Sequence, residues 1–98
     1  MVEEYNNGNS SEAQEIRNTI YELLMENSQY FCKDFNGMFD SDDAIECEIN
    51  DIVKRIKNGE DIEYVKQPTS DFDNTLQSLV KEYIRLGGRD DVIAEDGL

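Results

Sequence analysis

The sequence predicts an all-α protein, a small three- to four-helix bundle. Apolar residues recur three and four positions apart in three separate segments, which is the spacing of one buried face of a helix. Helix-starting and helix-stopping residues stand between these segments. A brief alternation around Ile62 and Tyr64 is too short and isolated to found a sheet. The chain of 98 residues suits one domain with one core.

The first helix is predicted over residues 11–27. Ser11 and Gln14 have the spacing of a capping box, in which two side chains bond the free N–H groups of the first turn. The apolar stripe of this helix is expected to face the core. The stripe consists of Ala13, Ile16, Ile20, Leu23 and Leu24.

An aromatic and acidic stretch follows the first helix. Residues 30–39 hold three of the four phenylalanines, and residues 40–43 add three aspartates directly after them. Phe31 and Phe35 are one helical turn apart, so a short helical piece is expected around residues 30–36. We expect the rings to form a hub on which the flanking helices pack, and the acids to face water.

The second helix is predicted over residues 41–58 and has the clearest ends. Asp40 or Ser41 is expected to cap it, and acids in its first turn and bases in its last turn suit the helix dipole. Asn58-Gly59 supplies a left-handed stop. Its apolar stripe consists of Ile45, Ile49, Ile52, Val53 and Ile56.

The third helix is predicted over residues 70–86, after an extended connector at residues 60–68. Ser70 or Thr69 is expected to cap it, and Gly87-Gly88 to stop it. Its buried face is expected to hold Phe72, Leu76, Leu79, Val80, Tyr83 and Ile84. In the core we expect Ile49, Ile52 and Ile56 to face Leu76, Leu79 and Tyr83, with Ile20, Leu24, Phe31 and Phe35 completing the packing.

These elements predict a helical domain at residues 10–88 between two flexible ends. Residues 1–9 are polar and rich in Asn and Gly, and residues 89–98 offer only Val92 and Ile93 for packing. The N-terminus resembles no secretion signal, and no apolar run approaches the length of a membrane span. The expected location is the cytoplasm.

Catalytic and metal-binding patterns are absent from the sequence. The chain has no histidine, and its two cysteines, Cys32 and Cys47, lie too far apart for a CxxC motif, which excludes Cys/His zinc sites and Cys–His nucleophile pairs. Two free, buried thiols are favoured over a disulfide. Residues 34–37 resemble the start of a calcium loop but lack its later ligands. We therefore expect no enzyme, no metal, no cofactor and no small-molecule ligand.

Charge is the strongest compositional signal. The chain has 23 acids and 9 bases, a net charge of −14, and residues 1–51 hold 13 of the acids against Arg17 and Lys33 alone. Such a field repels nucleic acid and anionic membranes and attracts basic proteins. Acidity that serves solubility alone is the other interpretation.

Two stretches carry a resemblance to known proteins. The run from Tyr30 to Phe35, followed by the acidic helix start at residues 41–44, resembles a stretch in immunity proteins of contact-dependent growth-inhibition systems. The segment at residues 62–64 is similar in layout to nuclease-colicin immunity proteins, although Val65 replaces the second tyrosine of their toxin-binding pair. The resemblance implies a small helical protein that binds and blocks a toxin domain.

Two functional hypotheses remain. The first is an immunity or antitoxin protein that covers the basic cleft of a nuclease toxin. The second is a phage-encoded inhibitor that imitates nucleic acid and blocks a host enzyme such as a CRISPR effector. A duplex mimic should space its carboxylates evenly, whereas this chain concentrates them in its first half, which favours the toxin. The expected partner-binding residues are Glu15, Glu22, Tyr30, Asp40, Asp42, Asp43 and Glu46.

Overall fold

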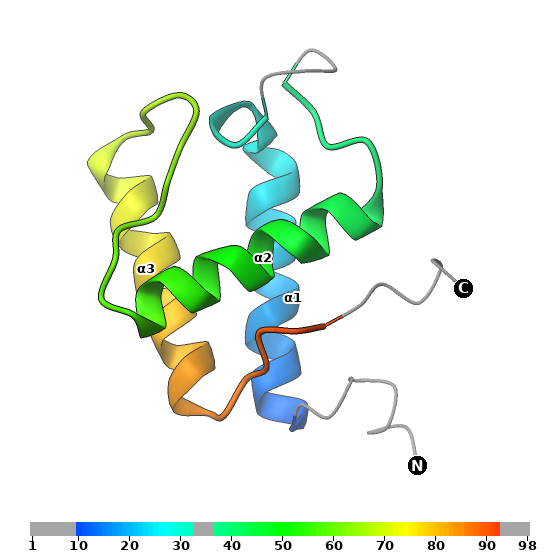
Figure 1. Cartoon of the computed structure of the whole chain (residues 1–98), viewed down its shortest axis with the longest axis vertical. Coiled ribbons are helices and arrows are strands. Elements are labelled where there is room, and N and C mark those ends of the chain that lie inside the picture. Colours follow the sequence, from blue (N-terminus) through cyan, green and yellow to red (C-terminus); the bar gives the residue numbers. More distant parts are fainter. Residues whose placement is uncertain (1–9, 33–36, 93–98) are drawn as a thin grey trace.

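The computed structural model describes residues 10–32 and 37–92. It contains three α-helices, α1 (Ser11–Glu26), α2 (Asp42–Lys57) and α3 (Ser70–Arg85), and one short 3-10 helix, η2 (Ser28–Tyr30). Helices α1 and α3 lie side by side and run in opposite directions, and α2 crosses over both of them (Figure 1). No described residue belongs to a strand, and the all-α class is confirmed. The crossing of α2 makes two layers of helices instead of an up-and-down bundle.

The start of α1 differs from the prediction by one residue. Ser10 is the N-cap, with an extended backbone and a hydroxyl that accepts a hydrogen bond from the Ala13 N–H at 3.1 Å. Ser11 is already helical, and the Gln14 side-chain amide donates to Asn18 Oδ1 at 3.0 Å. The predicted capping box between Ser11 and Gln14 is therefore wrong.

The other helix ends follow the local signals closely. Ser41 caps α2 by accepting from the Ala44 N–H at 3.2 Å, and Thr69 caps α3 in the same way. Gly59 and Gly87 have φ values of 78° and 80°, a region that L side chains rarely adopt. The three long helices thus begin and end within one residue of the predicted limits.

One apolar core joins the three helices. Most residues of the predicted apolar faces are buried. Six of them are half-buried and pack against the core: Ile16, Leu23, Ile56, Phe72, Leu79 and Ile84. Phe35 lies outside the described residues. The buried core comprises Ala13, Ile20, Leu24, Phe31, Ile45, Ile49, Ile52, Val53, Ile62, Leu76, Val80 and Tyr83.

Part of the predicted aromatic hub is described. A helical piece, η2, ends at Tyr30, where the predicted piece at residues 30–36 begins, and residues 33–36 lie outside the described part. Phe31 is buried, and its ring centroid lies 5.4 Å from Tyr64, 6.2 Å from Phe72 and 6.3 Å from Phe39. The hub therefore joins η2, the connector and α3, because rings at these spacings attract one another beyond simple burial.

The segment after α3 packs against the helices. The prediction is a flexible tail from residue 89, yet residues 89–92 run back past α1 and α2, and Val92 is buried (Figure 1). Residues 1–9 and 93–98, the other predicted flexible parts, lie outside the described residues. Cys32 and Cys47 form no disulfide, but Cys32 is half-buried and Cys47 exposed, where two buried thiols were predicted.

Candidate functional site

Negative charge is distributed unevenly over the fold. Among the described residues, the bases that form ion pairs are Arg17 and bases from Arg55 onward, and the latter neutralise acids close to them in space. The acids of the outer face of α1 and of the start of α2 form no ion pair within the described part of the chain. These acids are Glu12, Glu15, Glu22, Glu26, Asp40, Asp42 and Asp43.

A shallow pocket lies among these unpaired acids, where the end of α1 meets the start of α2. It has a volume of about 200 Å³, and we call it the methionine–aspartate pocket. Met25 and Met38 stand at its edge with 51% and 61% of their surfaces exposed, which is unusual for large apolar side chains. Its lining includes Met25, Met38, Phe39, Asp40, Asp42 and Ile45.

A hydrogen bond between helices holds this pocket together. The Tyr21 hydroxyl of α1 donates to Asp42 Oδ1 of α2 at 2.5 Å. Met25 follows Tyr21 by one helical turn, so it is placed directly beside the start of α2. The pocket is therefore built from two elements that are fixed to each other.

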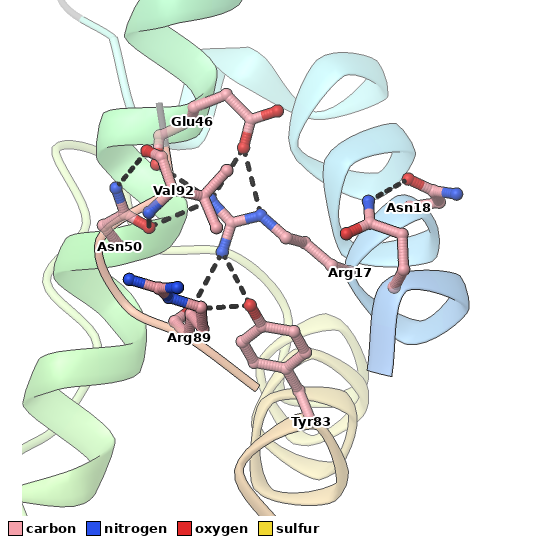
Figure 2. A network of polar contacts seen from close by, with 8 residues as sticks. Arg17, Asn18, Glu46, Asn50, Tyr83, Arg89 and Val92 are labelled. Carbon is pink, nitrogen blue, oxygen red and sulfur yellow. Dashed lines mark hydrogen bonds and ion pairs between the residues drawn. The ribbon is translucent and has the colours of Figure 1, made fainter. Parts of the chain in front are cut away.

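Glu46 has a different role from the one predicted. Its Oε1 accepts hydrogen bonds from Arg17 Nη2 at 2.7 Å and from Arg17 Nε at 3.0 Å (Figure 2). The Arg17 side chain is 2% exposed and that of Glu46 is 20% exposed. The Glu46 carboxylate therefore serves the fold, and its predicted contact with a partner stays a prediction.

The same guanidinium organises the C-terminal segment. Arg17 Nη1 donates to the Tyr83 hydroxyl at 3.1 Å and to the Arg89 carbonyl at 3.3 Å, and the Tyr83 hydroxyl also donates to that carbonyl at 2.5 Å (Figure 2). Asn50 accepts from Arg17 Nη2 at 2.9 Å and donates to the Val92 carbonyl at 2.8 Å. Arg17 therefore links all three helices and residues 89–92, with each polar group satisfied as burial requires.

Tyr30 is half-buried and is not a free anchor. Its ring lies 5.2 Å from the ring of Phe72, and its carbonyl accepts from the Val65 N–H at 2.8 Å. Its contacts tie η2 to the connector and to α3. By contrast Glu15 and Glu22 are exposed on the outer face of α1.

A second pocket lies farther along α2. It has a volume of about 420 Å³ and we call it the Glu48 pocket. Burial, together with the charges of Asp51 and Glu63, raises the pKa of Glu48 to about 7 against an opposing effect of Arg55. The pocket is lined by Phe31, Glu48, Asp51, Glu63, Tyr64 and Val65.

The wall of this pocket is fixed by a tyrosine–aspartate contact. The Tyr64 hydroxyl donates to Asp73 Oδ1 at 2.6 Å. Burial and this hydrogen bond raise the pKa of the Tyr64 phenol, so the hydroxyl keeps its proton and remains a donor. The connector is thereby joined to α3 beside the hub.

The structure brings together only part of the predicted site. Asp40, Asp42 and Asp43 gather at the start of α2, beside exposed methionines that the sequence patterns did not indicate. The sequence did contain a signal that Arg17 faces the core, because it occupies a position on the apolar stripe between Ala13 and Ile20. Nothing local marks Glu48, because its surroundings come from the connector.

No group of three or more His, Cys, Asp or Glu residues in the described ranges could hold a metal ion. None of the helices seen in those ranges is long and apolar enough to cross a membrane. No protein-family model, curated protein or solved structure matches the chain.

Proposed function

We propose that this protein is an immunity protein that binds a basic toxin domain, with nuclease activity, in the cytoplasm and blocks it without catalysis. One observation carries the proposal: exposed methionines are surrounded by carboxylates that no described base neutralises. An apolar centre inside a polar rim is the usual composition of a protein interface. Met side chains adapt to irregular partner surfaces, which suits them to the centre.

The charges and the methionines would serve different steps of binding. Unpaired carboxylates on α1 and at the start of α2 attract a basic protein from solution and accelerate its encounter. Burial of Met25 and Met38 against the partner removes apolar surface from water, which slows dissociation. A nuclease cleft is a fitting partner because it carries basic side chains that normally bind the phosphates of nucleic acid.

The nucleic-acid mimic has less support. Its carboxylates should follow one another along an extended surface with the spacing of phosphates. Here Asp40 and Asp42 surround an apolar pocket instead. A phosphate backbone has no counterpart to the exposed methionines.

Co-expression with the product of the neighbouring gene, which the proposal expects to be a basic toxin domain, tests the proposal. We expect the wild type to restore growth and to abolish nuclease activity of the purified toxin in a one-to-one complex. The variant Met25→Ser/Met38→Ser/Asp40→Lys should lose protection while it retains the helical circular dichroism spectrum. Asp71→Lys is the matched control, because Asp71 is an exposed acid in the first turn of α3, away from the pocket. Full protection by the triple variant would overturn this interface.

A further inference from the structure

We propose that the Glu48 pocket receives one lysine or arginine side chain of the basic partner, as a second contact beside the methionine–aspartate pocket. That the cation belongs to this partner rests on the function proposed above. The preference of the pocket for a cation does not, because it follows from the residues that line it.

The two pockets are neighbours on one surface. Phe39 lines the methionine–aspartate pocket and Phe31 lines the Glu48 pocket, and these two rings stack with centroids 6.3 Å apart. Ile45 and Glu48, which line the first and the second pocket, are one turn apart on α2. These contacts place the Glu48 pocket next to the methionine–aspartate pocket.

The lining of the Glu48 pocket fits a long cationic side chain. The Phe31 and Tyr64 rings offer apolar contact for a methylene stem and, through their faces, attraction for a positive head group. Val65 is 46% exposed at the edge and would be covered by the stem. Three carboxylates line the pocket beside the head group, which excludes an anion, and an apolar ligand would leave Glu48 without water or a partner.

Glu48 is the carboxylate that remains for a ligand. Arg55 already contacts Asp51 Oδ2 at 3.0 Å and Glu63 Oε1 at 2.8 Å. Arg55 also contacts Glu60 at 3.4 Å, and no described base forms an ion pair with Glu48. A bound ammonium or guanidinium would supply the positive charge that Glu48 lacks.

This arrangement makes cation binding depend on pH. The charged groups around Glu48 are Asp51 and Arg55 on α2 and Glu63 on the connector, and burial with the two acids places the pKa of Glu48 at about 7. A cation binds the ionised form, so its affinity should rise about tenfold from pH 6 to pH 8, as linkage requires. The chain has no histidine, so no imidazole competes as the source of such a change.

NMR titration of the whole chain with side-chain analogues tests the proposal. The probes are n-butylammonium and n-propylguanidinium chloride, added at constant ionic strength against potassium chloride. We expect localised shifts of the Val65 methyl groups, the Tyr64 ring and the Glu48 carboxyl carbon, with affinity about tenfold lower at pH 6 than at pH 8. Glu48→Gln should bind weakly at both values, and Glu22→Gln, an exposed acid outside the pocket, should behave as the wild type.

Two results would overturn the proposal: shifts spread over all acidic side chains, or an affinity that is unchanged by pH or by Glu48→Gln. Either result leaves the immunity function standing, because the toxin assay does not involve these probes. Conversely, the protein could fail to block the toxin while the probes still give localised shifts. That result would refute the immunity function and leave the cation-binding pocket standing.

Discussion

Two glutamates on α2, only two residues apart, have opposite electrostatic surroundings. Glu46 points toward α1, where the buried Arg17 guanidinium bonds its carboxylate at 2.7 Å. Glu48 lies on the side of the connector, where burial and two neighbouring acids raise its pKa to about 7. We call the Glu46 face of α2, which holds the fold together, the neutralised side; the exposed acids at the start of α2, together with Glu48, form ion pairs with no described base and are called the unneutralised side.

The comparison shows that acid content alone does not define a binding surface. Glu46 and Glu48 are chemically identical, and each adds one unit of negative charge to the composition. What differs is the element opposite each of them: a buried base for Glu46, and rings and further acids for Glu48. A carboxylate becomes available for recognition only where the fold leaves it without a base.

The largest effect is expected on the neutralised side. Arg17→Met should lower the free energy of unfolding by about 3–5 kcal/mol, because Glu46 would keep a partly buried charge with no partner. Urea unfolding measures the loss. Arg17→Met/Glu46→Leu should recover much of it, whereas Arg85→Met, which breaks an exposed pair with Glu82, should cost only a small fraction of that loss. A loss for Arg17→Met as small as that for Arg85→Met would remove Arg17 from the centre of the fold.

Gly88→Ala tests the same side through packing. A Cβ at position 88 would lie 2.4 Å from ring atoms of Tyr83, and that ring is buried and anchored by its hydroxyl. We expect a loss of about 1–3 kcal/mol, as for other overpacked sites. Thermal unfolding measures it, with Ser78→Ala on the exposed face of α3 as the control. A neutral Gly88→Ala would mean that residues 89–92 are held loosely.

On the unneutralised side, one substitution should stabilise the protein. The pKa of Glu48 is higher in the folded chain than its ordinary value of 4.5, so ionisation opposes folding. The free-energy cost of ionising Glu48 in the folded chain is absent below pH 4.5 and complete above pH 7. Glu48→Gln should therefore raise the free energy of unfolding by about 1–2 kcal/mol at pH 8, a value reduced for partial solvent screening, and should change little at pH 4.5. Equal effects at both pH values would contradict the assigned cause.

The helices could be predicted from sequence and much of the site could not. Ser41, Thr69, Gly59 and Gly87 act through neighbours a few residues away, so local patterns place the helix ends well. Arg17 meets Glu46 across 29 positions of sequence, a pairing that depends on how α2 crosses α1.

The distance in sequence between contacting elements also explains the differences at the predicted site. Asp40, Asp42 and Asp43 were correctly expected to face water, because first-turn positions are exposed in most helices. Glu46 and Tyr30 were assigned to a partner because their contacts come from elements distant in sequence. Met25 and Met38 carry no local signal of exposure, since an apolar residue is expected to be buried.

The kinetics of binding to the basic toxin domain, followed over a series of salt concentrations, test the central claim most directly. We compare the wild type with Asp40→Lys/Asp43→Lys, which leaves Asp42 free to accept from Tyr21. Reversal at position 43 should also cost the helix up to about 1 kcal/mol, which unfolding experiments would measure separately.

If the unneutralised side binds the partner, wild-type association should slow at least about tenfold between low and high salt, and the double variant should lose most of that dependence. Association that is indifferent to salt, with the double variant binding like the wild type, would contradict the account.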